Sequence, residues 1–422
     1  MPEREQKPQI RFKGFSDVWE MHKFDELANY KKGPFGSSLT KDMFVPKGIN
    51  TVKVYEQQNA INKDWQLERY FIPNEYAVKM SSFEVKRGDI IVSCAGTIGE
   101  SYILPLNAEK GIINQALMRI RVYENIVNKS LFLFLFSNMI YDFSKTHSNG
   151  SAIKNIPPFA DLKPTTTMLP KKLEQEKLVG FISTVDNLIT LHQCKYEKLL
   201  TMKKSCLEKM FPQNENKNPE IRFKGFSVPW EEHKLSSVAT MHARIGWQNL
   251  RTSEFLDSGN YYLITGTDFI DGKIDLKTCH FVEKERYDQD KNIQIKNGSI
   301  LITKDGTLGK VAYVEGLDKP ATLNAGVFNV VIIDKNMENK YLFQYLKAPF
   351  LMDYVVKRAT GGTIKHLNQN ILVDFPVIHP SYEEQTKIGV FFSKLDDLIA
   401  LHQRKLKMLQ NIKKSCLEKM FV

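Results

Sequence analysis

The stretch Lys203-Lys204-Ser205-Cys206-Leu207-Glu208-Lys209-Met210-Phe211 returns letter for letter as Lys413 to Phe421, 210 residues later. A shorter repeat lies near the start of each half, where Ile10 to Ser16 reads the same as Ile221 to Ser227. Solenoid units are about 20 to 50 residues long, so this period does not describe a solenoid. The repeats indicate a duplicated globular domain followed by a duplicated connector.

The connectors are predicted to be long helices. The first, from Leu173 to Phe211, has no proline, one glycine and apolar residues that recur every seven positions, and the second connector repeats this pattern. Each would be a rod of roughly 58 Å, and we expect the two to pair antiparallel as a coiled coil. The predicted seam residues are Leu178, Val185, Leu188, Leu199, Ile388, Leu395, Leu398 and Leu409. His192 and His402 share one core-type position, where a polar residue is expected to fix the helix register or to lie at the edge of the seam.

The fold class that follows is α+β, with two similar mixed α/β domains joined by the two antiparallel helices in a pseudo-twofold symmetric arrangement. We expect the first domain at residues 1–170, the central connector helix at 171–212, the second domain at 213–380 and the C-terminal connector helix at 381–422. Runs of β-branched residues predict strands at 89–93 and 299–303, each entering a Gly-Thr-x-Gly turn. Apolar spacing predicts helices from Leu131 to Phe143 and from Tyr341 to Val356.

Charge and cysteine content limit the class of protein. The formal net charge of +11 over 422 residues favours a polyanionic partner such as nucleic acid, although many soluble proteins of this charge bind none. The five cysteines form no Cys-x-x-Cys pair and no metal-ligand spacing with a histidine, so reduced thiols are expected. The charged N-terminus does not read as a signal peptide, and the most apolar run, Leu131 to Phe136, is far shorter than the about 20 residues that cross a bilayer. A cytoplasmic location is expected.

Catalytic motifs are weak in this sequence. Asn155 to Phe159 resembles the Asn-Pro-Pro-Phe loop with which amino-methyltransferases hold a base, but an isoleucine is inserted and no glycine-rich turn for the methyl donor accompanies it. Glu84-Val85-Lys86 has the Glu-x-Lys form of some nucleases, yet its counterpart in the second half is Gln294-Ile295-Lys296. No phosphate-binding glycine loop of the nucleotide hydrolases is present. We therefore expect no catalytic residue, metal or cofactor in this chain.

Basic loops that contain glycine are the best candidates for a binding site. The segments 148–154 and 360–366 each combine glycine, a hydroxyl group and a lysine, and glycine lets a phosphate approach the backbone closely. A solvated turn before a strand remains the alternative for both. A further candidate is the loop from Lys31 to Ser38. The candidate residues in the two paired segments are Ser151, Lys154, Gly361, Gly362, Thr363 and Lys365.

The order of these motifs resembles the specificity subunit of type I restriction-modification systems. Each half starts with Arg-Phe-x-x-Phe-x-x-x-Trp, at Arg11 to Trp19 and Arg222 to Trp230. Each connector then begins with a Glu-Gln-x-Lys segment, at Glu174 to Lys177 and Glu384 to Lys387, and continues as Phe-x-Ser-x-x-Asp. The resemblance covers essentially the whole chain, because all these motifs occur twice in the same order.

The resemblance implies a function for the chain. Members of this family read a bipartite, asymmetric DNA sequence with one target-recognition domain for each half-site. They bind two modification subunits that methylate adenine N6 with S-adenosylmethionine, and two restriction subunits that use ATP and Mg²⁺ can join. Catalysis and its cofactors would therefore belong to the partners. Side chains able to reach base edges are Lys31, Lys32 and Lys41 in the first half and Arg244, Gln248, Asn249 and Arg251 in the second.

The unrepeated middles of the halves, roughly 31–126 and 241–334, would then read two different half-sites. Half-sites on one face of a duplex lie about 34 Å apart, a distance that the helical rod could fix. Two other classes stay open: a single-chain site-specific methyltransferase or nuclease, and a coiled-coil scaffold that binds protein.

Overall fold

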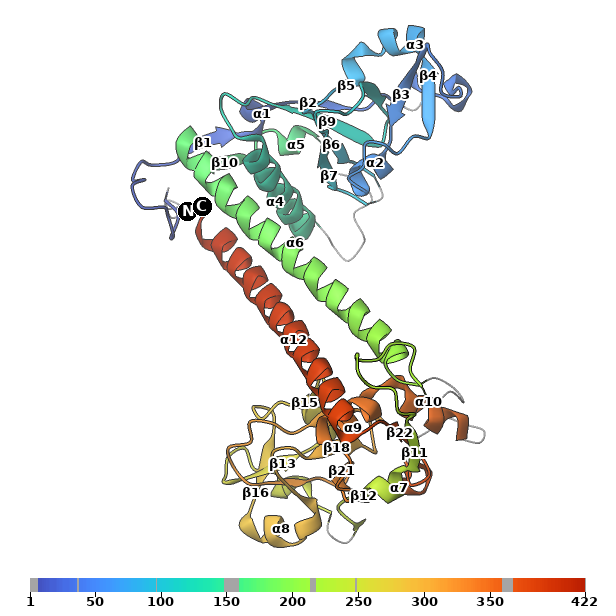
Figure 1. The fold of residues 1–422 in the computed structure, drawn as a ribbon. Coiled ribbons are helices and arrows are strands. Elements are labelled where there is room, and N and C mark those ends of the chain that lie inside the picture. Colours follow the sequence, from blue (N-terminus) through green and yellow to red (C-terminus); the bar gives the residue numbers. More distant parts are fainter. Residues whose placement is uncertain are drawn as a thin grey trace. The chain divides into compact units, whose positions relative to one another are not determined.

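The computed structural model describes residues 7–35, 38–95, 97–147, 159–212, 218–246, 249–358 and 367–421. The chain divides into two compact units, one made of Met1–Thr190 with Lys407–Val422 and the other of Leu191–Leu406. The two long helices, α6 (Lys172–Lys209) and α12 (Tyr382–Lys419), each contribute to both units. Each unit therefore holds one globular domain, the start of the long helix that follows it and the end of the other long helix (Figure 1). The domain borders expected at residues 170 and 380 stay predictions.

The first domain is built on two four-stranded sheets and one strand pair. The first sheet has the antiparallel order β2 (Ala28–Lys32), β9 (Leu117–Val122), β6 (Ile90–Ser93), β7 (Ser101–Ile103). The second has the order β4 (Tyr70–Pro73), β3 (Thr51–Tyr55), β8 (Gly111–Ile113), β5 (Glu84–Val85), with β3 and β8 parallel. The pair joins β1 (Glu20–Lys23) to β10 (Thr166–Leu169). The helices are α1 (Phe24–Leu27), α2 (Gln57–Ile61), α3 (Asn74–Lys79), α4 (Lys129–His147) and α5 (Phe159–Leu162).

Strand β6 is buried on both faces, which explains its continuous β-branched run. Successive side chains of a strand point to opposite faces. Ile90 and Val92 accordingly pack in the cluster that contains Phe132 of α4, whereas Ile91 packs in the cluster that contains Tyr55 of the second sheet. The helix predicted from Leu131 to Phe143 is confirmed as part of α4, which covers one face of the first sheet.

The second domain repeats the plan of the sheets and differs in two helical segments. Its sheets have the orders β12 (Ala239–His242), β21 (Val327–Ile332), β18 (Ile300–Thr303), β19 (Val311–Tyr313) and β16 (His280–Val282), β13 (Tyr261–Ile264), β20 (Ala321–Leu323), β17 (Gln294–Ile295). β11 (Glu231–Lys234) pairs with β22 (Pro376–His379). The helices are α7 (Leu235–Val238), α8 (Lys284–Asp288), α9 (Asn339–Lys347), α10 (Pro349–Arg358) and α11 (Gln369–Leu372). Where the first domain has α2, the second has a hairpin of β14 (Phe269–Ile270) and β15 (Lys273–Ile274).

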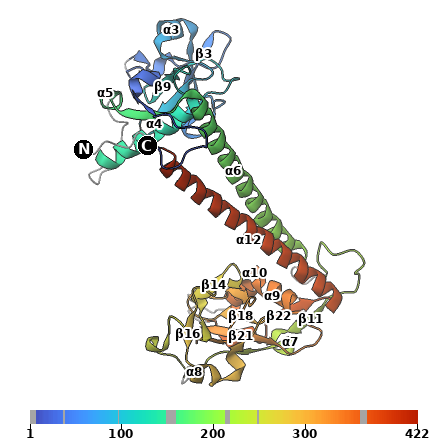
Figure 2. The ribbon, with the colours of Figure 1, turned by 90° about the vertical axis from the view of Figure 1, so that its left-hand side faces the viewer.

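The expectation of one helix from Tyr341 to Val356 is wrong. The chain forms α9 and α10 with a break at Ala348, whose ψ of 161° is extended. The cause is Pro349, because proline disfavours the helical region for the residue before it and has no N–H to continue the helix. Both helices contribute to the core that also contains the start of α12 (Figure 2).

The repeated sequence forms the frame that joins each domain to the long helices. Arg11 Nε and Nη2 donate to the two carboxylate oxygens of Glu174, both at 2.7 Å, and Arg222 repeats this bidentate pair with Glu384 at 2.8 and 2.7 Å. The C-terminal phenylalanine of each repeat packs on a tryptophan of its unit. The centroid distance is 6.2 Å between Phe421 and Trp19 and 6.4 Å between Phe211 and Trp230. These contacts explain why the edges of the two halves are duplicated.

The seam between the long helices differs from the prediction by one residue. Leu178, Val185, Ile388 and Leu395 are buried and Leu199 and Leu409 are half-buried, as predicted. Leu188 and Leu398 were predicted in the seam but are 40% and 45% exposed, so that prediction is wrong. The seam instead continues through Ile189 and Ile399, the next residue in each helix. Each lies four residues after the buried Val185 or Leu395 and therefore on the same face of its helix.

The long helices run antiparallel within each unit. In the second unit His192 Nδ1 lies 2.8 Å from His402 Nδ1, and Lys203 contacts Asp396, so residue numbers rise along one helix as they fall along the other. In the first unit Lys413 Nζ lies 2.6 Å from Asp186 Oδ1. Burial lowers the pKa of His402, and the nearby His192, Lys195 and Lys405 lower it further. Among the described residues, no helix combines the length and the apolar character that a membrane span needs.

Candidate nucleic-acid interface

In the first domain, the outer strand β2 and the central strand β6 finish at the same end of their sheet, which we call the loop edge. Lys32, the last residue of β2, pairs with Met118, and Ser93, the last residue of β6, pairs with Leu117. The loop after β2 and the turn after β6 therefore leave the same end of the sheet, on either side of the start of β9. Helix α4 reaches the same place, because a Cβ on Gly99 would lie 3.0 Å from the Ile140 side chain. The candidate segment 148–158 follows α4 but lies outside the described residues.

The loop after β2 is anchored by Gly33. A Cβ on Gly33 would lie 1.8 Å from the carbonyl oxygen of Asn114, so no side chain fits at this position. Gly33 N donates to Leu117 O at 2.8 Å, and Ser38 N donates to Phe35 O at 2.8 Å. The loop is thus tied to the sheet at Gly33 and held in a local turn by Ser38, and it presents Phe35, which is 87% exposed.

The predicted basic residues of the first domain lie in different surroundings. Lys32 is exposed at the end of β2, beside Phe35. Lys31 is half-buried. Its Nζ lies 4.8 Å from the centre of the Phe83 ring and forms a cation–π contact with it. Lys41 is exposed at the start of a 3-10 turn (Lys41–Met43) that packs toward the second sheet. Lys32 is therefore the predicted lysine that the structure places most directly at the loop edge.

The second domain has the same convergence at the corresponding edge. His242, the last residue of β12, pairs with Asn329, and Thr303, the last residue of β18, pairs with Val327. The turn after β18 begins with Lys304, whose carbonyl accepts from Leu367 N at 2.8 Å. Gln369 Nε2 donates to Met241 O at 3.2 Å, so the chain that follows segment 360–366 is fastened to both β12 and this turn.

Arg244 was predicted to read bases, and this prediction is wrong. Its side chain is part of the framework of the domain. Its side chain is 2% exposed. Nε donates to Leu323 O at 2.8 Å, Nη2 to Thr322 Oγ1 at 3.2 Å and Nη1 to Gln289 Oε1 at 3.1 Å. Burial lowers its pKa, with Arg286 acting in the same direction. A guanidinium used in this way has no free edge for a base.

The remaining predicted residues divide into exposed ones and ones outside the described chain. Asn249 and Arg251 are exposed, and the backbone N–H of Arg251 donates to Glu254 Oε2 at 2.8 Å. The predicted residues outside the described chain are Ser151, Lys154, Gln248, Gly361, Gly362, Thr363 and Lys365.

Sequence reasoning missed several residues at these loop edges. Phe35 lies inside a predicted loop but was not recognised as an exposed aromatic. Lys304 and Lys310 bracket the Gly-Thr-Leu-Gly turn; Lys304 is half-buried and Lys310 is exposed. The position of these lysines beside a glycine turn is the feature of the sequence that could have identified them as candidate binding residues. In the first domain the positions matching Lys304 and Lys310 are Cys94 and Glu100, and burial raises the pKa of Cys94 to about 12.

No metal-binding chemistry is apparent in the part of the chain that the structure describes, where no group of three or more His, Cys, Asp or Glu side chains could hold an ion. The two loop edges thus differ in composition: the first offers Lys32 and the aromatic Phe35, and the second offers Lys310, Asn249 and Arg251.

Comparison with known proteins identifies the family. The sequence matches the type I restriction modification DNA specificity domain twice, over residues 17–201 and 227–411. The chain belongs to this family. Its function is therefore DNA sequence recognition for a type I restriction-modification complex, and the family is a recognition family, not a catalytic one.

Individual relatives agree with this assignment. The MjaVIII type I restriction enzyme specificity subunit of Methanocaldococcus jannaschii is 23% identical over 378 residues, which cover 84% of this chain and 86% of the relative. The EcoBI specificity subunit of Escherichia coli is 23% identical over 337 residues, which cover 74% and 69%. The crystal structure of the S subunit of a type I restriction-modification system from M. genitalium has a TM-score of 0.61 at 16% identity and covers 99% of each chain, which supports the fold.

Proposed function

We propose that each domain of this chain reads one half of a bipartite, asymmetric DNA target through the loop edge of its β2- or β12-containing sheet. The observation that carries this proposal is the convergence, in both domains, of the loop after the first sheet strand with the turn after β6 or β18. Both loops are fixed to the sheet, and rigid elements position contacts more accurately than free loops do. The two edges carry different side chains, which suits two different half-sites.

The first edge combines charge with an aromatic surface. Lys32 is a flexible cation that suits a phosphate, because lysine acts as a strongly hydrated point charge. Phe35 is apolar, so its contact would be a base face or a thymine methyl group. Phosphate contacts would set the position of the domain, and base contacts would give it specificity.

The second edge is more basic. Lys310 is exposed at the turn after β18, and Asn249 and Arg251 are exposed in the loop that follows β12. Arginine and asparagine form the bidentate contacts that distinguish guanine and adenine in the major groove. These residues are therefore the preferred candidates for direct readout in the second domain.

Modification subunits would bind to exposed apolar residues beside the helix seam. Leu188 and Ile412 flank the Asp186–Lys413 ion pair of the first unit, and Met202 and Leu398 flank the equivalent Lys203–Asp396 pair of the second; each is at least 40% exposed. Two equivalent apolar sites suit two identical partners. Methylation with S-adenosylmethionine would take place on these partners, and two restriction subunits using ATP and Mg²⁺ could join them in the cytoplasm.

The test is methylome sequencing of a host that carries this chain with its modification subunit. The expected result is one bipartite methylated motif with two different half-sites and a fixed spacer. Exchange of the region 241–334 for that of another family member should change one half-site only. Methylation or cleavage by the purified chain alone would support a single-chain enzyme instead, and a complex without sequence preference would support a protein scaffold.

A further inference from the structure

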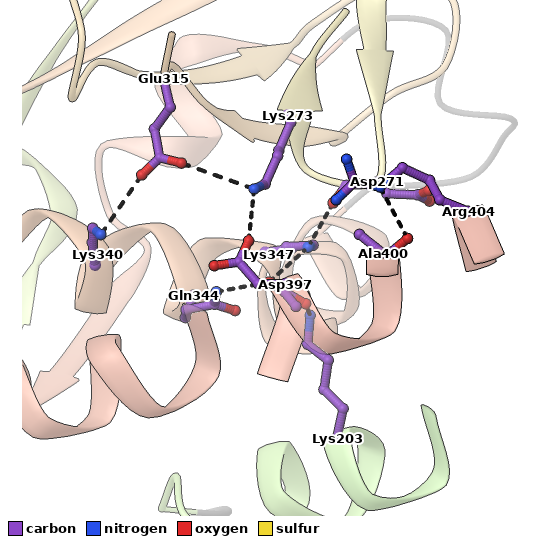
Figure 3. A network of polar contacts seen from close by, with 11 residues as sticks. Lys203, Asp271, Lys273, Glu315, Lys340, Gln344, Lys347, Asp397, Ala400 and Arg404 are labelled. Atoms are coloured by element: carbon purple, nitrogen blue, oxygen red, sulfur yellow. Dashed lines mark hydrogen bonds and ion pairs between the residues drawn. The ribbon is translucent and has the colours of Figure 1, made fainter. Parts of the chain in front are cut away.

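The second unit contains a buried polar joint between its recognition domain and the long helices. Asp396 of α12 lies at its centre. Figure 3 shows Lys203, Gln344 and Lys347, which converge on it. Lys203 of α6 donates to Asp396 Oδ1, and Gln344 Nε2 and Lys347 Nζ of α9 donate to Asp396 Oδ2 at 3.0 and 3.3 Å. Two helices of the frame and one helix of the domain thus share one carboxylate.

The joint also holds the hairpin that is peculiar to the second domain. Lys347 Nζ donates to Asp271 O at 3.0 Å in the β14–β15 turn. Asp271 and Gly272 have positive φ angles of 53° and 86°, as a two-residue hairpin turn requires. A Cβ on Gly272 would lie 2.5 Å from Lys347 Nζ, so the turn is pressed against the lysine. An outer set of charges surrounds the same turn, because Lys273 Nζ lies 2.9 Å from Asp397 Oδ1 and 3.9 Å from Glu315, which also faces Lys340 at 3.6 Å.

Charges inside the joint are strongly coupled. Burial lowers the pKa of Lys347 to about 8; Asp396 opposes this fall and Lys203 adds to it. Burial raises the pKa of Asp396, but Lys347 and Lys203 outweigh that effect and leave it below its usual value. The carboxylate therefore stays charged at neutral pH and keeps both ammonium groups in place.

The first unit lacks this arrangement at the equivalent positions. Asp186 and Lys413 form the matching ion pair, but their side chains are 46% and 34% exposed, against 15% and 13% for Asp396 and Lys203. Ser137 stands where the second domain has Lys347, and Phe134 stands in place of Gln344 and packs on Phe421 at 4.7 Å. The first domain meets its helices through apolar contacts at this point, whereas the second uses half-buried charged groups.

We propose that Lys347 and Asp396 are positioning residues that set the second recognition domain on α12, so that reading of one half-site depends on this joint and reading of the other does not. The inference rests on the proposed function. Neither side chain lies at the loop edge that would meet DNA, so their effect would be indirect: a shift of α9 and of the hairpin would displace the sheet that carries Lys304 and Lys310.

The test measures half-site discrimination by the complex with the modification subunit. Two DNA libraries are used, each with one half-site of the methylome-defined target randomised. In Lys347→Met the discrimination at one half-site should fall about tenfold, while the other should change less than twofold. Gly272→Ala, which pushes on the joint from the hairpin side, should affect the same half-site. The control is Asp25→Asn, which removes an open ion pair with Lys163 in the first domain and should leave both half-sites unchanged.

A pH profile separates positioning from general loss of structure. Wild-type discrimination at the dependent half-site should fall as pH rises through about 8, because Lys347 then loses its proton and its ion pair with Asp396. Lys347→Met should be flat over the same range. Equal loss at both half-sites, or unchanged discrimination in both Lys347→Met and Gly272→Ala, would overturn the inference while the proposed function stands. A wild-type complex without discrimination at either half-site would overturn the proposed function itself.

Discussion

Replacing Phe35 by alanine should weaken DNA binding without destabilising the chain. The side chain is 87% exposed, so it contributes little to the core, and the loop itself is held by Gly33 and by the Ser38 N–H. Stacking of an aromatic side chain on a base contributes about 1–3 kcal/mol by alanine substitution. This corresponds to roughly a 5- to 150-fold increase in Kd.

The assay is fluorescence anisotropy with the methylome-defined duplex and the purified complex of the chain with its modification subunit. Salt concentration must be fixed, because phosphate contacts make the affinity strongly dependent on it. Lys32→Ala provides a contrast, because loss of a phosphate contact should reduce the slope of log Kd against log salt by about one. Phe35→Ala should leave that slope unchanged and raise Kd at every salt concentration.

The matched control is Ile49→Ala, which removes another fully exposed apolar side chain from a different loop, just before β3. Its effect on Kd should stay within twofold. The reasoning is refuted if Phe35→Ala binds as tightly as wild type, or if Ile49→Ala weakens binding equally. A fall in the unfolding midpoint of Phe35→Ala would show that the side chain is structural.

Further predictions concern the frame. Leu395→Asp should lower the free energy of unfolding by about 3 kcal/mol or more, because it places a carboxylate in the buried seam. Leu398→Asp should lower it by less than about 1 kcal/mol and should instead weaken binding of the modification subunit. Urea unfolding measures the first effect, and a pull-down with the modification subunit measures the second. Arg222→Met should cost about 3–5 kcal/mol because Glu384 is left buried without its partner, and adding Glu384→Gln should recover much of the loss in the same unfolding assay. For His402, whose folded-state pKa is lowered, the unfolded chain takes up the proton first. Stability should therefore fall as pH drops below about 6.5, and a urea midpoint that is flat between pH 7.5 and 5.5 would contradict this.

The sequence predicts the frame well because its signals are periodic and local. A seven-residue recurrence is enough to identify the long helices, and Pro349 is a visible break that should have divided the helix predicted from Tyr341. Periodicity alone could not choose between Leu188 and Ile189 for the seam, since both are apolar and adjacent. The choice depends on which face meets the other helix, and that face is set by contacts some 200 residues away, such as Asp186 with Lys413.

The loop edges are harder to predict because their decisive contacts are long-range. A basic residue in a polar loop usually suggests a surface role, yet the guanidinium of Arg244 is used by the carbonyl of Leu323 and the hydroxyl of Thr322. Phe35 shows the opposite case, an apolar residue that is exposed. Nothing in the local sequence tells an exposed phenylalanine from a buried one.

Gly33 and Arg244 explain how the two domains keep one architecture while presenting different surfaces. Each is the fifth residue after an alanine that begins the sheet, Ala28 in β2 and Ala239 in β12, and these alanines pair at the same register with β9 and β21. Gly33 anchors its loop by having no side chain, so that the backbone of Asn114 can approach. Arg244 anchors the equivalent loop by a long side chain that reaches the end of β20. The start of the loop is thus fixed to the sheet by a missing side chain in one domain and by a long side chain in the other. The residues that follow can therefore differ between the domains. Divergence of the DNA sequence read would therefore need no change in the repeated frame, and Gly33→Arg should disrupt the first loop although arginine stands at the matching position of the second.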